Sequence, residues 1–277
     1  MTKKVLTILL TTLLFLSALT LGCANVFRVG NVAMVATVVS EESKEIVAQL
    51  KEEVFSSYKD RSIFSVKQKD VKSILDQYPY FRVVEFKKVY PNEIIVTIEE
   101  EAEVYAVEKA DGEYYILGET GAILEVRSSS KNRLDNADNV VIKGLTVNGE
   151  KGGILTGDDC WETMFLLCKT MHESLGGIRS NVQSVEVLSR SPETFYVIRM
   201  REGLNIYVGA PSVMTVEKAK SVMDKYMALS DAERMTGRLT VRDSDGEVFV
   251  SYSAEDEFDL FRLKLTAGPP PNKLTGS

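Results

Sequence analysis

The sequence predicts an α+β protein with two folded modules that follow an apolar N-terminal segment. Three observations lead to this fold class. Residues 5–27 contain no charged side chain. Along residues 28–100, the apolar residues first alternate with polar ones, then recur every three or four residues, and then alternate again. This pattern predicts a strand, two helices and two strands. Residues 101–256 form short alternating runs between turn residues, with two helical stretches, and predict a mixed α/β domain with a largely antiparallel sheet.

Composition narrows the function before any motif does. The chain has 277 residues, of which 44% are hydrophobic and 26% charged, as in ordinary globular domains. Its net charge is −7, so it lacks the basic surface that attracts nucleic-acid phosphates. We therefore expect no nucleic-acid partner.

The N-terminal segment decides the topology. A helix over residues 5–27 would measure roughly 34 Å at a rise of ~1.5 Å per residue, enough to cross a hydrocarbon core of ~30 Å. Lys3 and Lys4 precede the segment, and positive charge stays on the cytoplasmic side. We predict a cytoplasmic N-terminus at residues 1–4, a single transmembrane anchor at residues 5–27 that contacts the lipid bilayer, and an extracytoplasmic remainder.

Two other interpretations share this N-terminal pattern. Gly22-Cys23-Ala24 places small residues where a signal peptide is cleaved, and Leu21-Gly22-Cys23 is similar to the end of a lipoprotein signal. Whether the segment is retained, cleaved or lipidated stays open. All three interpretations place residues 28–277 outside the cytoplasm.

The first module is predicted at residues 28–100. A β-prone run at 28–39 precedes Ser40, which is placed to cap a helix with Ile46, Val47, Leu50 and Val54 on one face. A second helix, with its apolar face at residues 71–78, ends where Pro79 forbids its continuation. A hairpin then turns at residues 90–93. Glu99, Glu100 and Glu101 are interpreted as a solvated strand end.

The second module is predicted at residues 101–256 and is followed by a flexible tail at 257–277. Its expected strands lie at 104–107, 113–117, 122–126, 182–188, 195–200, 204–208, 238–241 and 248–252, and a further apolar run at 140–145 precedes the first helix. One helix is expected to start at Asp158 or Asp159 and to stop at Gly176, and another to span 216–226.

Patterns that could carry chemistry are weak. Cys168 and His172 share a helix face, but no third or fourth ligand accompanies them. The two Ser-x-x-Lys patterns, at residues 56–59 and 128–131, lack the companion motifs of penicillin-binding enzymes. Cys160 and Cys168, roughly 12 Å apart on one helix, are too distant for a disulfide. We therefore expect no catalytic residue, metal site, cofactor or small-molecule substrate.

The order of these signals resembles a known family. The segments that carry the resemblance in the first module are Ile63-Phe64-Ser65-Val66, Tyr78-Pro79-Tyr80-Phe81, Lys88-Val89-Tyr90-Pro91-Asn92 and Ile98-Glu99-Glu100. They resemble a POTRA domain (polypeptide-transport-associated) of the FtsQ/DivIB type, and residues 101–256 resemble the β domain of that family. The resemblance implies a non-enzymatic scaffold of the bacterial division machinery in the cell membrane at the septum. It also implies partners of the FtsB/DivIC and FtsL types and control of septal peptidoglycan synthesis.

Two alternatives to this function stay open. One is a POTRA-bearing envelope lipoprotein or assembly protein, and the other is an enzyme of cell-wall metabolism. Binding to ectodomains of the FtsB/DivIC and FtsL types would separate the family's function from both.

The resemblance also places a partner site on the last strand and the turn before it. A terminal strand with a free edge offers unpaired backbone groups to an added strand. The residues expected to bind the partner are Arg242, Asp243, Val248, Phe249, Val250, Ser251 and Tyr252. The alternative is that Phe249 and Tyr252 pack against the domain core or against the 257–265 tail.

Overall fold

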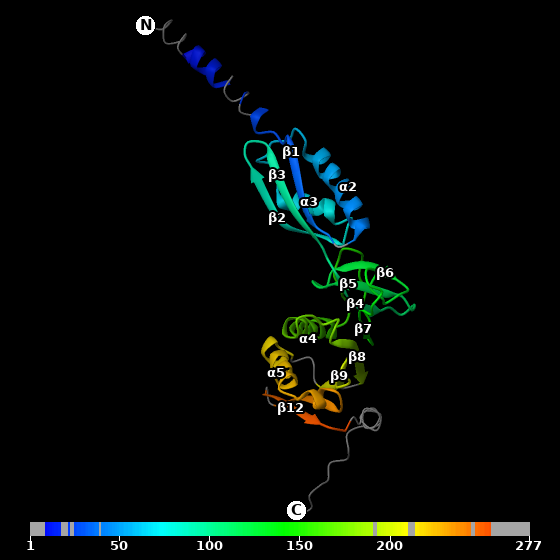
Figure 1. Ribbon diagram of the computed structural model, residues 1–277. Coiled ribbons are helices and arrows are strands. Elements are labelled where there is room, and N and C mark those ends of the chain that lie inside the picture. Colours follow the sequence, from blue (N-terminus) through cyan, green and yellow to red (C-terminus); the bar gives the residue numbers. More distant parts are fainter. Residues whose placement is uncertain are drawn as a thin grey trace, which may run out of the picture. The chain divides into compact units, whose positions relative to one another are not determined.

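The computed structural model describes residues 9–17, 22, 25–38, 40–190, 193–209, 214–244 and 247–255 (Figure 1). The chain divides into two compact units, Met1–Ala102 and Glu103–Ser277, which we call unit 1 and unit 2. The tail expected at 257–277 lies outside the described residues.

The N-terminal segment is described only in part. Residues 9–17 are helical, whereas residues 5–8, 18–21, 23 and 24 lie outside the description. Within the described ranges, no helix has both the length and the apolar character needed to span a membrane. The anchor at 5–27 stays a prediction.

Unit 1 has the predicted order of strand, two helices and two strands. Its elements are β1 (Asn31–Thr37), α2 (Glu41–Tyr58), α3 (Gln68–Leu75), β2 (Phe81–Val89) and β3 (Glu93–Glu100). The strands form one sheet in the order β1-β3-β2, with β1 parallel and β2 antiparallel to the central β3. Both helices lie on one face of this sheet (Figure 1).

Capping and apolar spacing explain the helices of unit 1. The Ser43 N–H donates to the Ser40 side-chain oxygen at 3.1 Å, which confirms Ser40 as the N-cap of α2. The buried residues of α2 include Leu50 and Val54, which join the core with the inward-facing residues of β3. Helix α3 ends at Leu75, earlier than predicted, because residues 76–80 form turns before β2 begins.

The expectation that Glu99, Glu100 and Glu101 are all solvated is wrong for two of them. Glu100 and Glu101 are each only 7% exposed. The Ser43 hydroxyl donates to Glu100 Oε1 at 2.6 Å, which ties the end of β3 to the start of α2. Only Glu99 faces solvent, where it pairs with Arg82 at 2.8 Å.

Unit 2 is a nine-stranded sheet covered by helices. Its strands are β4 (Glu103–Glu108), β5 (Tyr114–Gly118), β6 (Ile123–Arg127), β7 (Val140–Lys143), β8 (Val182–Arg190), β9 (Glu193–Met200), β10 (Asn205–Gly209), β11 (Arg238–Ser244) and β12 (Glu247–Ser253). Its helices are α4 (Cys160–Leu175), α5 (Val216–Met227) and the short α6 (Asp231–Arg234).

The sheet of unit 2 runs in the order β12-β11-β10-β9-β8-β7-β4-β5-β6. Five of its strand pairs are antiparallel and three are parallel, which matches the predicted mixed but largely antiparallel sheet. Helices α4 and α5 pack together and contribute their apolar residues to the same core as the sheet.

Helix α4 has the predicted start and stop. The Cys160 N–H donates to Asp158 Oδ1 at 2.9 Å, and Gly176 ends the helix with a positive φ of 65°. Cys160 and Cys168 are free thiols, as expected from their spacing. Burial raises the pKa of the Cys168 thiol to about 12, so this side chain is a packed, protonated group.

The position of Gly144, directly after β7, requires glycine. A Cβ at this position would lie 2.0 Å from the Val187 carbonyl oxygen, and φ is +83°. We expect Gly144→Ala to lower the free energy of unfolding by about 2 kcal/mol, because backbone strain and a clash add together. Gly112→Ala is the matched control, since Gly112 has φ +82° but no atom within 4 Å of a Cβ. Denaturant unfolding followed at Trp161 should show the larger loss for Gly144→Ala, and equal losses would contradict the clash.

Candidate functional site

The predicted partner strand lies at one end of the sheet. Strand β12 pairs antiparallel with β11, in a register that places Leu239 opposite Tyr252 and Arg242 opposite Phe249. Among the described strands, β12 has no neighbour on its other side. In an antiparallel ladder, alternate residues direct both N–H and C=O away from the paired strand. The outer edge of β12 therefore presents backbone donors and acceptors along the strand.

The side chains of β12 divide between two faces. Val248, Val250 and Tyr252 pack against the core of unit 2. Phe249 is 54% exposed, and Ser251 and Arg242 are exposed as well. Of the alternative in which Phe249 and Tyr252 pack against the domain core or the 257–265 tail, packing against the core fits Tyr252 but not Phe249. The 257–265 tail lies outside the described residues.

The hairpin is held firmly to the sheet. Gly237, just before β11, has φ +80°, and a Cβ there would lie 2.2 Å from the Ser253 carbonyl oxygen. The Tyr252 hydroxyl donates to the Thr236 carbonyl at 3.4 Å. Helix α5 also packs beside β12. An edge fixed in this way offers its backbone groups to a partner in one arrangement, which lowers the entropic cost of binding.

The surface that we call the β12 edge consists of Arg242, Phe249 and Ser251 with the outer backbone of β12. An extended peptide could add to it as a further strand, with an apolar residue against Phe249 and a carboxylate near Arg242. Asp243 is described through its backbone, which pairs with Val248. The binding role of all seven residues stays a prediction.

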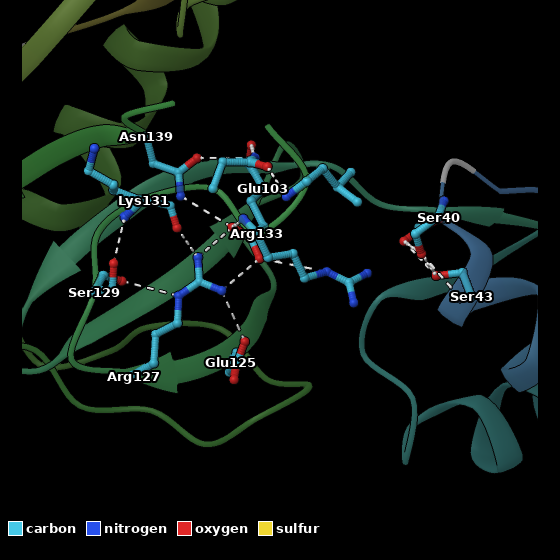
Figure 2. Close-up of polar contacts among 12 residues, drawn as sticks. Ser40, Ser43, Glu103, Glu125, Arg127, Ser129, Lys131, Arg133 and Asn139 are labelled. Carbon is cyan, nitrogen blue, oxygen red and sulfur yellow. Dashed lines mark hydrogen bonds and ion pairs between the residues drawn. The ribbon is translucent and has the colours of Figure 1, made fainter. Parts of the chain in front are cut away.

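A buried polar cluster in unit 2 was not predicted. Glu103, at the start of β4, has a side chain that is only 1% exposed and that receives Arg127 Nη2 at 2.6 Å and Nη1 at 3.0 Å (Figure 2). The Arg133 backbone N–H and Asn139 Nδ2 donate to the same carboxylate, at 3.1 and 3.4 Å. We call these four residues the Glu103 network. It fastens the loop 128–139 to the sheet, so its role is structural.

Sequence reasoning missed the Glu103 network because its members come from two separate strands and from the loop that follows the second. The only signal was an acidic residue at the start of a strand with an apolar centre, followed by the basic Arg127 in another strand. Neither residue type identifies the other as its partner.

The weak chemical patterns remain isolated in the structure. The Ser56 hydroxyl donates to the Glu53 carbonyl at 2.9 Å. Cys168 Sγ lies 3.6 Å from Met164 Sδ, and His172 Nε2 lies 3.4 Å from Glu119. Over the described part of the chain, no three potential ligands gather in a group that could hold a metal ion.

Comparison with known proteins agrees with the fold of unit 1. Residues 40–101 match the family of FtsQ-type POTRA domains. The chain is also 30% identical over 89 residues to the cell division protein DivIB of Clostridium tetani (strain Massachusetts / E88). This match covers 32% of the chain and 33% of the relative, so it spans about a third of each protein. The predicted resemblance to the FtsQ/DivIB family is confirmed.

Proposed function

We propose that this chain, which carries an FtsQ-type POTRA domain and resembles the FtsQ/DivIB family, is a non-catalytic scaffold of bacterial cell division. In this proposal, residues 5–27 anchor it in the cell membrane at the septum. Units 1 and 2 then lie outside the cytoplasm. There it docks proteins of the FtsB/DivIC and FtsL types and so controls septal peptidoglycan synthesis.

The β12 edge is the observation that carries this proposal. It combines an open strand edge with an exposed aromatic residue, Phe249, and an exposed cation, Arg242, on neighbouring strands. Backbone pairing supplies affinity, and the two side chains supply specificity for an apolar and an acidic residue of the partner. These are the features by which a sheet receives an extended segment of another protein.

Proline substitutions on β12 test the docking site. Phe249 and Val250 are consecutive, so their N–H groups point to opposite sides of the strand. Proline deletes the donor, and it is tolerated only where the donor faces the open edge. We expect one of Phe249→Pro and Val250→Pro to stay folded and to lose at least tenfold in affinity for the FtsB/DivIC-type ectodomain. The other should weaken the β11–β12 ladder, which circular dichroism and thermal unfolding would detect.

A charge reversal gives a second measure of the same site. Arg242→Glu should weaken partner binding about tenfold, because it places like charges together at the interface. Lys151→Glu is the control, since Lys151 is exposed outside the hairpin and the change in net charge is the same. If the folded proline variant and Arg242→Glu both bind like the parent, the docking site is not the β12 edge.

A further inference from the structure

Three aromatic rings gather at one end of unit 1. Phe27, Phe64 and Tyr90 come from three separate segments, and their centroids are 5.3 Å (Phe27–Phe64), 5.4 Å (Phe64–Tyr90) and 6.3 Å (Phe27–Tyr90) apart. Phe64 is 58% exposed and Tyr90 is 56% exposed. We call these three residues the aromatic cluster. Large aromatic groups gathered at a surface indicate an interaction site more often than scattered ones do.

Contacts within unit 1 hold the rings of the aromatic cluster at the surface. Ile63, next to Phe64, is fully buried in the core, so the loop turns the neighbouring ring outward. The Ile63 N–H donates to the Phe27 carbonyl at 2.9 Å, and Lys88 Nζ donates to the Phe64 carbonyl at 3.3 Å. These bonds join the three segments that carry the rings, so the cluster is held in place.

The same end of unit 1 has a positive balance of charge. Residues 27–30, 59–65 and 88–93 contain four cations, Arg28, Lys59, Arg61 and Lys88, and two acids, Asp60 and Glu93, a balance of +2 in a chain whose net charge is −7. Glu93 already accepts a hydrogen bond from Asn31 at 2.7 Å. Exposed aromatic groups beside cations are the combination that favours the headgroup region of an anionic membrane.

Chain continuity brings this surface to the bilayer. Phe27 is the last residue of the charge-free run 5–27 and is itself a member of the aromatic cluster. If residues 5–27 span the membrane, Phe27 lies where the chain leaves the hydrocarbon core. The rings of Phe64 and Tyr90 both contact the Phe27 ring and therefore lie close to the same point. A diacylated Cys23 would also hold Phe27 beside the bilayer, because the lipid anchor is then only four residues from Phe27.

We propose that Phe64 and Tyr90, together with Phe27, dock this end of unit 1 onto the lipid headgroup region of the membrane that holds residues 5–27. The docked rings limit the angles that unit 1 can take relative to the bilayer, so that the module is presented in a preferred orientation. This inference rests on the membrane attachment within the proposed function and is independent of partner binding at the β12 edge.

Quenching by brominated lipids tests the docking directly. The full chain carries a single tryptophan, Trp161. The Trp161→Phe variant therefore has no tryptophan fluorescence of its own, and Phe64→Trp is introduced into it. The protein is reconstituted in vesicles of phosphatidylcholine and phosphatidylglycerol, with bromine near the top of the acyl chains. We expect the indole emission of the Phe64→Trp variant to fall at least twofold relative to vesicles without bromine.

Val84→Trp in the same background is the matched control. Val84 is 54% exposed and lies on β2, far along the strand from Tyr90. The emission of this variant should change little on bromination. Because the cations attract anionic lipid, vesicles of phosphatidylcholine alone, or high salt, should reduce the quenching of the Phe64→Trp variant. Adding Tyr90→Ser to that variant should reduce the quenching as well.

The outcomes separate this inference from the proposed function. Equal quenching of the Phe64→Trp and Val84→Trp variants in a membrane-attached chain would overturn the docking while leaving the β12 edge untouched. Intact-mass analysis of membrane-extracted protein establishes the attachment. A mature chain that starts at Asn25 without a lipid would remove the premise and overturn the proposal, whatever the partner-binding result.

Discussion

Glu103→Ala is expected to lower the free energy of unfolding of unit 2 by about 3–5 kcal/mol, the range found when one partner of a buried ion pair is removed. The Glu103 side chain is 1% exposed, and Arg127 reaches it with both terminal nitrogens, at 2.6 and 3.0 Å. Without the carboxylate, the Arg127 guanidinium, itself mostly buried, loses its main partner. Trp161 is the only tryptophan and lies in the core of unit 2, so denaturant unfolding followed by its fluorescence measures this loss.

Asp135→Ala is the matched control for the Glu103 network. Asp135 lies on the same loop and also pairs with an arginine, Arg179, at 2.5 Å, but its side chain is 52% exposed. Exposed pairs are worth about 0.2–1 kcal/mol, so this variant should change the Trp161 transition little. The double variant Glu103→Met with Arg127→Met should recover much of the lost stability, because both charges are then absent. A Glu103→Ala transition close to that of Asp135→Ala would show that the buried pair does not stabilise the loop.

Local patterns were enough to predict most elements of both units, although not the short helix α6. The alternation through Ile94, Val96 and Ile98 identified β3, and the helical spacing through Leu50 and Val54 identified α2. These patterns work because one face of each element is buried and the other is solvated. The same reasoning failed for charged residues such as Glu100 and Glu103, whose burial depends on Ser43 and Arg127 far away in the sequence.

The candidate site was predictable only in part, because local patterns identify a strand but not its neighbours in the sheet. Strand β12 is the last described strand in the sequence and also an end of the sheet, as expected. The parallel pairing of β11 with β10, which sets the neighbours of the hairpin, has no local signal. Sequence analysis named Phe64 only within a segment that carries the family resemblance, because no short pattern distinguishes an aromatic residue that folding leaves exposed from one that it buries.

Glu100→Ala is expected to destabilise unit 1 by about 3 kcal/mol, since hydrogen bonds to a buried charged group are worth about 1.5–3 kcal/mol. Glu100 is 7% exposed and accepts hydrogen bonds from the Ser43 hydroxyl at 2.6 Å and the Ser40 backbone N–H at 3.4 Å. Both donors lie at the start of α2, where the helix dipole also favours a negative charge. Hydrogen exchange of the α2 amides should therefore become faster in this variant.

Glu99→Ala, at the neighbouring residue, separates the buried carboxylate from the general effect of removing an acid. Glu99 pairs with Arg82 at the surface, and its loss should cost less than about 1 kcal/mol. Ser43→Ala removes the 2.6 Å donor alone, and a double variant with Glu100→Ala should cost less than the sum of the two single losses, because the residues share one bond. The hydrophobic clusters of the two units have no residue in common, so the Trp161 transition should stay near that of the parent. If the α2 amides of Glu100→Ala exchange as slowly as those of the parent, the carboxylate does not hold the start of α2 to β3.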